Sequence, residues 1–248
     1  MSFLLWFLGV LTILILIIFI FGFPRKKSER IPSLEGIDNP DVAKAYERMT
    51  NFLPFKLLQR KIVSHLKKFH PQGLLVDIGC GSGNLIVQIA EKFPNLKLGG
   101  VDISNEILEL ARKRADAHGL GEKIEFKLGN ATKLPFPDAS VDFIISTFSM
   151  HHWTNPLDVL NEIYRVLKKD GTFLIFDFRR DARKFFYGLF TFVTKVVVPK
   201  PLKRVKEPLG SIKASYTPEE ALQICAQSPF ATVMIKPFLA WMFISSKK

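Results

Sequence analysis

Short apolar runs and amphipathic stretches alternate through the middle of the chain. The apolar runs predict strands, and the stretches with apolar residues every three or four positions predict helices. Strands are predicted at 74–78, 97–101, 123–128, 141–146 and 172–178, with helices at 83–93, 104–118 and 155–168 between them. Because strands that alternate with helices of about 10–15 residues form a parallel sheet covered on both faces, this region predicts a doubly wound α/β fold.

Further elements are predicted on both sides of this alternating region. Residues 41–69 follow a helical pattern that Pro54 interrupts, and a helix is predicted at 218–227. Residues 231–236 and 240–245 read as two neighbouring strands. These two strands predict a closing antiparallel hairpin, which brings the mostly parallel sheet to seven strands.

A run without any charged side chain opens the chain, over residues 3–23. As a helix it is long enough for the hydrocarbon core of a bilayer, which is about 30 Å thick. A cleaved signal peptide fits less well, because no Lys or Arg precedes the run and no small-residue cleavage site follows it. We therefore predict a transmembrane anchor at 1–24, a polar linker at 25–40, and a domain at 41–248 that faces the cytoplasm.

A second apolar stretch lies between the last parallel strand and the closing hairpin. Residues 181–198 have apolar side chains at helical spacing, but their apolar part, 185–198, is too short to cross a bilayer. Lys and Arg flank this stretch on both sides, which is typical of a helix that lies in a membrane interface. A lid or core helix with a basic rim is an equally good interpretation, so 181–216 is predicted to be a lid or a membrane-facing insertion.

The net charge of +12 is distributed unevenly. Residues 179–213 hold 10 Lys and Arg against 2 acidic residues, and residues 24–75 hold 11 against 5, whereas residues 76–178 hold 11 against 14. Basic flanks around a slightly acidic centre suit either a nucleic acid or an anionic lipid surface. The 2 cysteines provide neither a disulfide framework nor the usual ligands of zinc, so no metal site is predicted.

The first predicted strand runs directly into a glycine-rich loop. Gly79, Gly81 and Gly83 let the backbone turn sharply and approach a ligand, and the following helix presents N–H groups at its start. Asn84 stands where the dinucleotide fingerprint of dehydrogenases has Gly or Ala, which disfavours that function. Asp102 ends the second strand, about 20 residues further on, where a carboxylate can accept both hydroxyl groups of a ribose.

Four segments carry a family resemblance, in order along the chain. They read VDIGCGSGN (76–84), VDIS (101–104), GNATKLPFPDASVDFIIS (129–146) and LNEIYRVLKKDGTFLIFDF (160–178). At these separations they resemble the class I S-adenosylmethionine-dependent methyltransferases, particularly the small-molecule enzymes that include the quinone-biosynthesis methyltransferases. The resemblance implies S-adenosyl-L-methionine as the cofactor and methyl transfer as the reaction.

The resemblance also implies roles for the glycine loop. Gly79, Gly81 and Gly83 match the positions that form the floor under the methionine part of the cofactor. Asp77, which precedes them on the strand, matches the residue near the cofactor's amino group. These four residues are therefore candidate cofactor-binding residues.

The other candidate cofactor-binding residues follow later strands. By the resemblance, Asp102 would bind the ribose hydroxyls, and Ile103 would lie against the adenine ring. Asn130 and Ala131 stand where the family usually has Asp-Ala, so that Asn130 would accept the adenine amino group without a charge. Ser146, with the two residues after it, would face the sulfonium and the methyl acceptor.

Two histidines follow the fourth strand and are candidate catalytic residues. Methyl transfer from a sulfonium requires alignment and exclusion of water, and it requires a base only if the acceptor must lose a proton. His151 and His152 lie at the expected crevice, and histidine has a suitable pKa for this role. His-His-Trp is also frequent in the family, so the pair can instead serve only to pack the loop.

The functions that we weigh differ in their acceptor. A membrane-tethered enzyme that methylates a lipophilic small molecule, such as a quinone, a lipid, a phenol or a thiol, agrees best with the predicted anchor. An RNA or protein methyltransferase is the alternative that the basic flanks permit, although Ser146–Met150 reads STFSM and lacks the Asn-Pro-Pro-Tyr-like signature of nucleic-acid enzymes. A non-catalytic scaffold that binds S-adenosylmethionine is the third, and its only support is Asn130.

Overall fold

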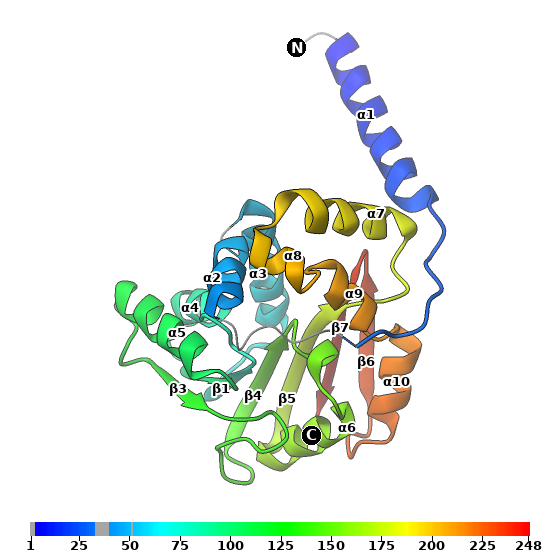
Figure 1. Cartoon of the computed structure of the whole chain (residues 1–248). Helices are drawn as coiled ribbons and strands as arrows, with labels where there is room; N and C mark the ends of the chain where they lie inside the picture. Colours follow the sequence, from blue (N-terminus) through cyan, green and yellow to red (C-terminus); the bar gives the residue numbers. More distant parts are fainter. Residues whose placement is uncertain (1–2, 33–39, 51) are drawn as a thin grey trace.

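One mixed sheet of seven strands forms the centre of the molecule (Figure 1). The structure, a computed structural model, describes residues 3–32, 40–50 and 52–248. The strand order is β3-β2-β1-β4-β5-β7-β6, in which the first five strands of the order are parallel and β7 is antiparallel to both of its neighbours. The strands are β1 Leu74–Ile78, β2 Lys97–Asp102, β3 Ile124–Leu128, β4 Val141–Thr147, β5 Leu167–Phe178, β6 Val233–Phe238 and β7 Trp241–Lys247. The predicted fold with its closing hairpin is confirmed.

Helices cover both faces of this sheet, because successive strand residues point to opposite sides. On one face, Leu75 and its neighbours pack against α3, α4 and α5. On the other face, Val76 and its neighbours pack against α6 and α10. These helices are α3 Leu53–Leu66, α4 Asn84–Lys92, α5 Asn105–Ala117, α6 Pro156–Val166 and α10 Pro218–Ala226. Both buried faces are continuous and apolar, so the strand ends are held in fixed positions relative to one another.

The insertion between β5 and β6 contains several short helices rather than one. They are α7 Lys184–Phe192, the π-helical turn η3 Val193–Val197, α8 Lys200–Arg204 and α9 Leu209–Ala214. The helix predicted at 181–198 begins later, at Lys184, because the backbone of Arg183 before it is extended. Leu202 of α8 is fully buried against α2 (Pro40–Thr50), in a small apolar cluster separate from the two main cores. The insertion thus closes over the end of the sheet (Figure 1).

The N-terminal apolar run forms α1, Phe3–Gly22, which stands away from the rest of the molecule (Figure 1). Within the described ranges, no helix combines the length and the apolar character that crossing a membrane requires. The transmembrane anchor predicted at 1–24 is therefore not supported, although a helix does occupy this run. Large side chains such as Trp6, Ile13 and Ile18 are more than half exposed on it.

Residues 24–31 connect α1 to the domain, and we call them the strap. The backbone of Lys26 donates to the carbonyl of Ala182 at 3.0 Å, and the backbone of Lys184 donates to that of Pro24 at 3.0 Å. Further along, the Arg30 guanidinium donates to the carbonyl oxygens of Ala214 at 2.6 Å and of His151 at 3.1 Å. The strap is therefore bonded both to the insertion and to the loop after β4.

Candidate active site

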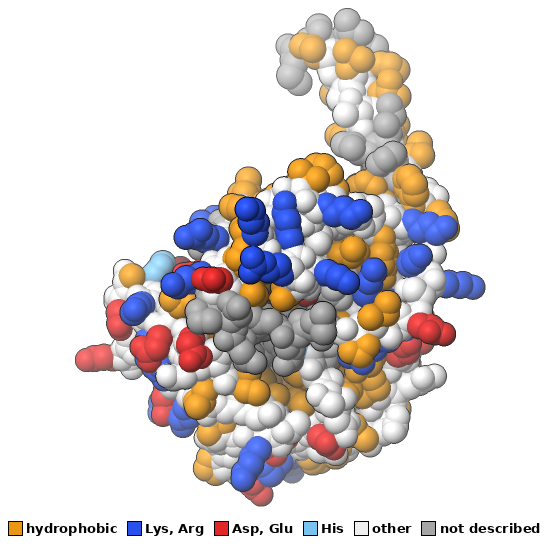
Figure 2. All heavy atoms as spheres, in the orientation of Figure 1, with side chains coloured by type: hydrophobic (Ala, Val, Ile, Leu, Met, Phe, Trp, Pro, Cys, Tyr) orange, Lys and Arg blue, Asp and Glu red, His pale blue; other side chains and the backbone are white. Residues whose placement is uncertain are grey.

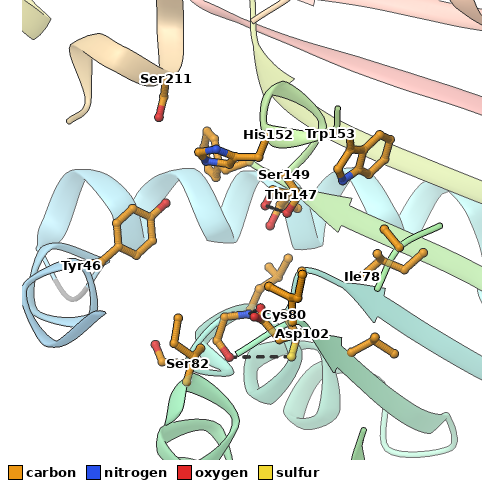
Figure 3. Close-up of a pocket in the computed structure, with 18 of the residues that line it drawn as sticks. Tyr46, Ile78, Cys80, Ser82, Asp102, Thr147, Ser149, His152, Trp153 and Ser211 are labelled. Carbon is orange, nitrogen blue, oxygen red and sulfur yellow. Dashed lines mark hydrogen bonds between the residues drawn. The ribbon is translucent and has the colours of Figure 1, made fainter. Parts of the chain in front are cut away.

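A cavity of about 580 Å³ opens at the carboxyl ends of β1, β2 and β4. One side of it is formed by the loops after β1, β2 and β3, and the other side by α2, α3, the insertion and the 3₁₀ turn η2 (Met150–His152) that follows β4. Figure 3 shows Tyr46, His152 and Ser211 across the cavity from Cys80 and Asp102. The carboxyl ends of parallel strands are the usual ligand site of an open α/β sheet, and this cavity occupies that place.

The glycine loop turns sharply under the cavity. The backbone N–H groups of Gly79 and Cys80 both donate to the carbonyl of Val101, at 2.8 and 3.0 Å. Gly79 has a φ of +72°, and a Cβ atom at this position would lie 2.2 Å from Oγ of Ser149. Only glycine avoids both the backbone strain and this collision, so Gly79 brings the loop after β1 directly against the loop after β4.

Asp102 holds the glycine loop from the neighbouring strand. Its Oδ2 accepts from the backbone N–H of Gly81 at 2.9 Å, and its Oδ1 accepts from that of Ser104 at 3.1 Å. Burial raises the pKa of Asp102, and the backbone hydrogen bonds oppose this rise. Ser104 itself caps α5 by accepting from Ile107 at 3.3 Å, so Asp102 is not needed for that role. The carboxylate is thus fixed at the edge of the cavity, which it lines.

Asp77 is a buried carboxylate without an obvious structural partner. It is 1% exposed, and no hydrogen bond reaches its Oδ1 in the described part of the chain. Burial, and secondarily the charge of Asp102, raise the pKa of Asp77 to about 8. A buried carboxylate with an unused oxygen is costly unless a donor or a cation approaches it. Asp77 is therefore suited to bind a positively charged group at the end of β1.

Asn130 lies at the third strand end and is exposed. Its Oδ1 accepts from the backbone N–H and from the hydroxyl of Thr132, both at 3.0 Å. The amide oxygen that the sequence reading assigned to an adenine amino group is therefore already occupied by a local turn. Asn130, Ala131 and Thr132 nevertheless all line the cavity.

The two histidines after β4 lie in different environments. His151 is buried, and its Nδ1 lies 2.7 Å from Oδ1 of Asp177, whose Oδ2 accepts from the backbone N–H of His151 at 2.9 Å. Burial lowers the pKa of His151, but the charge and the hydrogen bond of Asp177 outweigh it, so that the pKa is raised overall. Burial, together with the charges of His151 and Arg30, lowers the pKa of His152 to about 2. His152, which lines the cavity, is therefore a neutral and weakly basic imidazole at ordinary pH.

Comparisons with known proteins agree with this geometry. A family described as "Methyltransferase domain" matches residues 76–175. A demethylmenaquinone methyltransferase of Bacteroides fragilis is 30% identical over 177 residues, which are 70% of this chain and 70% of that protein. A ubiquinone/menaquinone biosynthesis C-methyltransferase of Rickettsia bellii is 27% identical over 187 residues, 73% of this chain and 75% of that one. The chain is a class I S-adenosylmethionine-dependent methyltransferase.

Solved structures share the fold of this methyltransferase. A candidate S-adenosyl-L-methionine-dependent methyltransferase from Methanococcus maripaludis has a TM-score of 0.68 at 19% identity, and covers 88% of this chain and 97% of its own. A plantazolicin methyltransferase, BamL, in complex with a triazolic desmethylPZN analogue and SAH has a TM-score of 0.66 at 17% identity, and covers 86% of this chain and 92% of its own. The second structure holds the demethylated cofactor product within the same fold.

The cavity of the methyltransferase fits the cofactor that the family implies. S-adenosylmethionine has an amino group, a ribose and a sulfonium, and the carboxylate of Asp102, which lines the cavity, suits the ribose hydroxyls. The residues predicted for cofactor binding that line the cavity are Gly79, Gly81, Asp102, Ile103, Asn130 and Ala131. Asp77, Gly83 and Ser146 lie behind that lining, as does His151 of the two predicted histidines. Ser146 donates its hydroxyl to the carbonyl of Ile78 at 2.7 Å, so that it ties β4 to β1.

The sequence reading missed most of the opposite wall of the methyltransferase cavity. Tyr46, Phe55 and Gln59 come from α2 and α3, and Glu207 and Ser211 come from the insertion. The apolar side of α2 in the sequence could have indicated that Tyr46 faces the interior. The sequence does not indicate that Glu207 lines the cavity, because an acidic residue in a strongly basic segment is expected at the surface.

Proposed function

We propose that this methyltransferase acts on a lipophilic small molecule of the quinone type. One observation carries the proposal: apolar and aromatic side chains from α2, α3 and the insertion line much of the cavity wall that lies across from the cofactor loops. Among them are Val42, Phe55, Leu202 and Val205. The relatives named for demethylmenaquinone and for ubiquinone and menaquinone support an acceptor of this kind.

The residues of the protein mainly bind and align the reactants in this reaction. S-adenosylmethionine, when bound, supplies an activated methyl group and leaves as a neutral thioether. Asp102 would hold the ribose, and the glycine loop would lie under the methionine part of the cofactor. The apolar side chains on the opposite wall would align the acceptor and keep water out. Of the predicted histidines, His152 would contact the acceptor, and His151 would orient the loop from behind through Asp177.

The chemical class of the acceptor can be tested with an extract of membrane lipids. Purified enzyme is incubated with methyl-labelled cofactor and with a solvent extract of membrane lipids, and labelled products are separated and identified by mass. We expect a labelled product that partitions into the organic phase, and that is heavier than a component of the extract by the mass of one labelled methyl group less one hydrogen. A parallel incubation with total RNA and total protein is the control, and label only in these polymers would contradict the proposal.

We also propose that the enzyme works in contact with a membrane surface. Apolar side chains are exposed on α1 and on the segment α7–η3, where Phe192 and Val196 are 56% and 59% exposed. The two segments lie close together only where α1 ends, since the ring of Phe23, directly after α1, lies 6.3 Å from that of Phe185 in α7. Figure 2 shows Lys and Arg gathered on the upper face of the domain, over the insertion. An apolar ridge beside basic side chains is the pattern of helices that lie in an anionic lipid interface.

Flotation with vesicles tests the membrane contact. The full chain is expected to float with vesicles that contain anionic lipid, and Phe192→Ser together with Val196→Ser is expected to weaken binding roughly tenfold or more, from the lost apolar area. The matched control is Leu222→Ser on α10, since Leu222 is 50% exposed and lies outside the ridge. Equal flotation of the double variant and the control variant would argue against contact through α7–η3.

A further inference from the structure

Helix α3 separates the cavity from the surroundings by the thickness of one helix. Its residues Phe55, Gln59 and Ile62 line the cavity. Residues two positions apart on a helix point to nearly opposite sides, because each residue turns the helix by about 100°. Leu53 and Leu57 are one turn apart and therefore face away from the cavity, and they are 66% and 53% exposed. The same helix thus borders the cavity on one face and the surroundings on the other.

The outer face of α3 is apolar where the helix begins. Phe52, which directly precedes Leu53, is 49% exposed. Its carbonyl accepts from the backbone N–H of Lys56 at 3.1 Å, so Phe52 belongs to the first turn of the helix. We call Phe52, Leu53 and Leu57 the α3 patch. Single exposed apolar side chains are common on protein surfaces, whereas several together are typical of an interaction site.

The α3 patch and the segment α7–η3 are connected through one small apolar cluster. Phe55 of α3 and Val193 of η3 both pack against it, and α2 and α8 supply its buried members (Figure 1). Val42, Leu202 and Val205 of this region also line the cavity, as Phe55 does. The cluster is therefore a thin apolar layer between the cavity and the exposed apolar side chains of α3 and η3.

The charged residues of these two segments are all basic. Neither α3 nor the segment 184–206 contains Asp or Glu, and the Lys and Arg of both are exposed, namely Lys56, Arg60, Lys61, Lys184, Lys195, Lys200, Lys203, Arg204 and Lys206. A second copy of the chain fits this surface poorly, because a two-fold interface brings identical patches, and hence like charges, together. An anionic lipid surface complements both the basic and the apolar side chains.

We propose that the α3 patch rests on the same anionic lipid surface as α7–η3, and that the acceptor enters the cavity from this lipid, beside Phe55. This inference rests on the proposed function, since it needs both the lipophilic acceptor and the membrane contact. Leu53 and Leu57 enter the boundary of the acyl chains, while Lys56 and Arg60 extend to the headgroups. An acceptor that enters in this way never leaves an apolar environment for water, which would be unfavourable for a lipophilic molecule.

A fluorescent label on α3 tests the contact directly. The full chain with Leu57→Cys is labelled with NBD, a fluorophore whose emission rises and shifts to the blue when it leaves water. Cys80 and Cys225 are buried, so the label reacts with the introduced thiol. With vesicles of phosphatidylcholine and phosphatidylglycerol we expect a severalfold rise in emission, and quenching by a nitroxide-labelled lipid. The matched control is Leu222→Cys on α10, which is 50% exposed outside both segments and should keep an aqueous spectrum.

The outcomes separate this inference from the membrane contact already proposed. Flotation of the labelled chain without a spectral change at position 57 overturns the α3 contact and leaves contact through α1 or α7–η3 standing. Absence of flotation counts against both proposals. A change that needs no vesicles and grows with protein concentration would indicate a second copy of the chain. A change with RNA but not with anionic vesicles would indicate a nucleic acid, and either of these two results overturns the lipid assignment.

The entry of the acceptor is tested by the way in which the lipid extract is presented. Leu53→Ser together with Leu57→Ser should lower turnover about tenfold when the extract is held in anionic vesicles, because apolar contact with the lipid is lost. Turnover should stay unchanged when the same extract is dispersed in detergent, and Leu222→Ser should be normal in both. An equal loss in vesicles and in detergent overturns entry from the lipid.

Two further measurements keep a folding defect and a wrong acceptor apart from this inference. The double variant should bind the demethylated cofactor product, S-adenosylhomocysteine, with unchanged affinity. If it does not, the substitutions have damaged the fold, and the label at position 57 decides the proposal. Absence of turnover in the unsubstituted enzyme counts against the proposed acceptor, while the same label still decides whether α3 contacts the lipid.

Discussion

Asp102→Ala is expected to weaken cofactor binding by at least about 100-fold. The substitution removes the carboxylate that we propose accepts the ribose hydroxyls, and hydrogen bonds to a charged group contribute about 1.5–3 kcal/mol each. It also leaves the backbone N–H groups of Gly81 and Ser104 without their acceptor, since both donate to this carboxylate in the unsubstituted protein. The loop under the cofactor then loses its tie to β2, which adds to the loss. Calorimetric titration with S-adenosylhomocysteine measures the effect directly.

Two further variants separate these contributions. Asp102→Asn keeps the shape and one acceptor oxygen, so its affinity should lie between those of the unsubstituted enzyme and Asp102→Ala. Glu109→Gln, an exposed acidic residue on α5, should bind the cofactor product normally. If Asp102→Ala bound S-adenosylhomocysteine as tightly as Glu109→Gln does, the ribose assignment would be wrong.

Asp177→Ala is expected to cost about 3–5 kcal/mol of unfolding free energy, because breaking a buried charged pair leaves its partners unsatisfied. The carboxylate accepts from Nδ1 of His151, from the backbone of His151 and, at 2.7 Å, from the backbone of Phe178. For a chain of this size, the midpoint of thermal unfolding should fall by roughly 6–15 °C. Asp170→Asn is the control, since Asp170 pairs with Lys247 at the surface and Asn tolerates its left-handed backbone, so the midpoint should change little.

The same pair predicts a dependence of stability on pH. The pKa of His151 is raised in the folded state, because Asp177 outweighs the opposing effect of burial and of the Arg30 charge. The folded state therefore holds the proton more tightly than the unfolded chain does. The stabilisation is fully present below the unfolded pKa of about 6.5 and is lost as pH rises through the raised folded pKa. The difference in stability between the unsubstituted enzyme and Asp177→Asn should shrink over this range, and a constant difference would contradict the assignment.

The sheet could be read from the sequence because each strand is a short apolar run with a turn at its end. Strand β1 and its glycine loop lie where the pattern predicts them, and Ser104 and Thr217 cap their helices. The strand β5 begins at Leu167, earlier than predicted, because α6 ends at Val166 and the chain becomes extended at once. Such elements depend on the types and spacing of residues that are neighbours in the chain, and these can be read directly from a sequence.

The acceptor side of the site could not be read in this way. Glu207 reaches the cavity only because α8 packs on α2, a contact between segments more than 150 residues apart in the chain. The spacing of residues along the sequence does not predict this contact. The cofactor side could be predicted from the sequence, because its residues directly follow strands whose order the fold determines.

The strap has a consequence for how the domain is presented to its surroundings. If this segment made no hydrogen bonds to the domain, it would be a flexible linker, and the domain could rotate freely relative to α1. The strap instead bonds Lys26 to the start of the insertion and Arg30 to the loop of His151, so the direction of α1 is fixed relative to the cavity. A surface that contacted α1 would therefore set which way the cavity faces. Arg30, which helps to carry this orientation, also holds the loop after β4 in place.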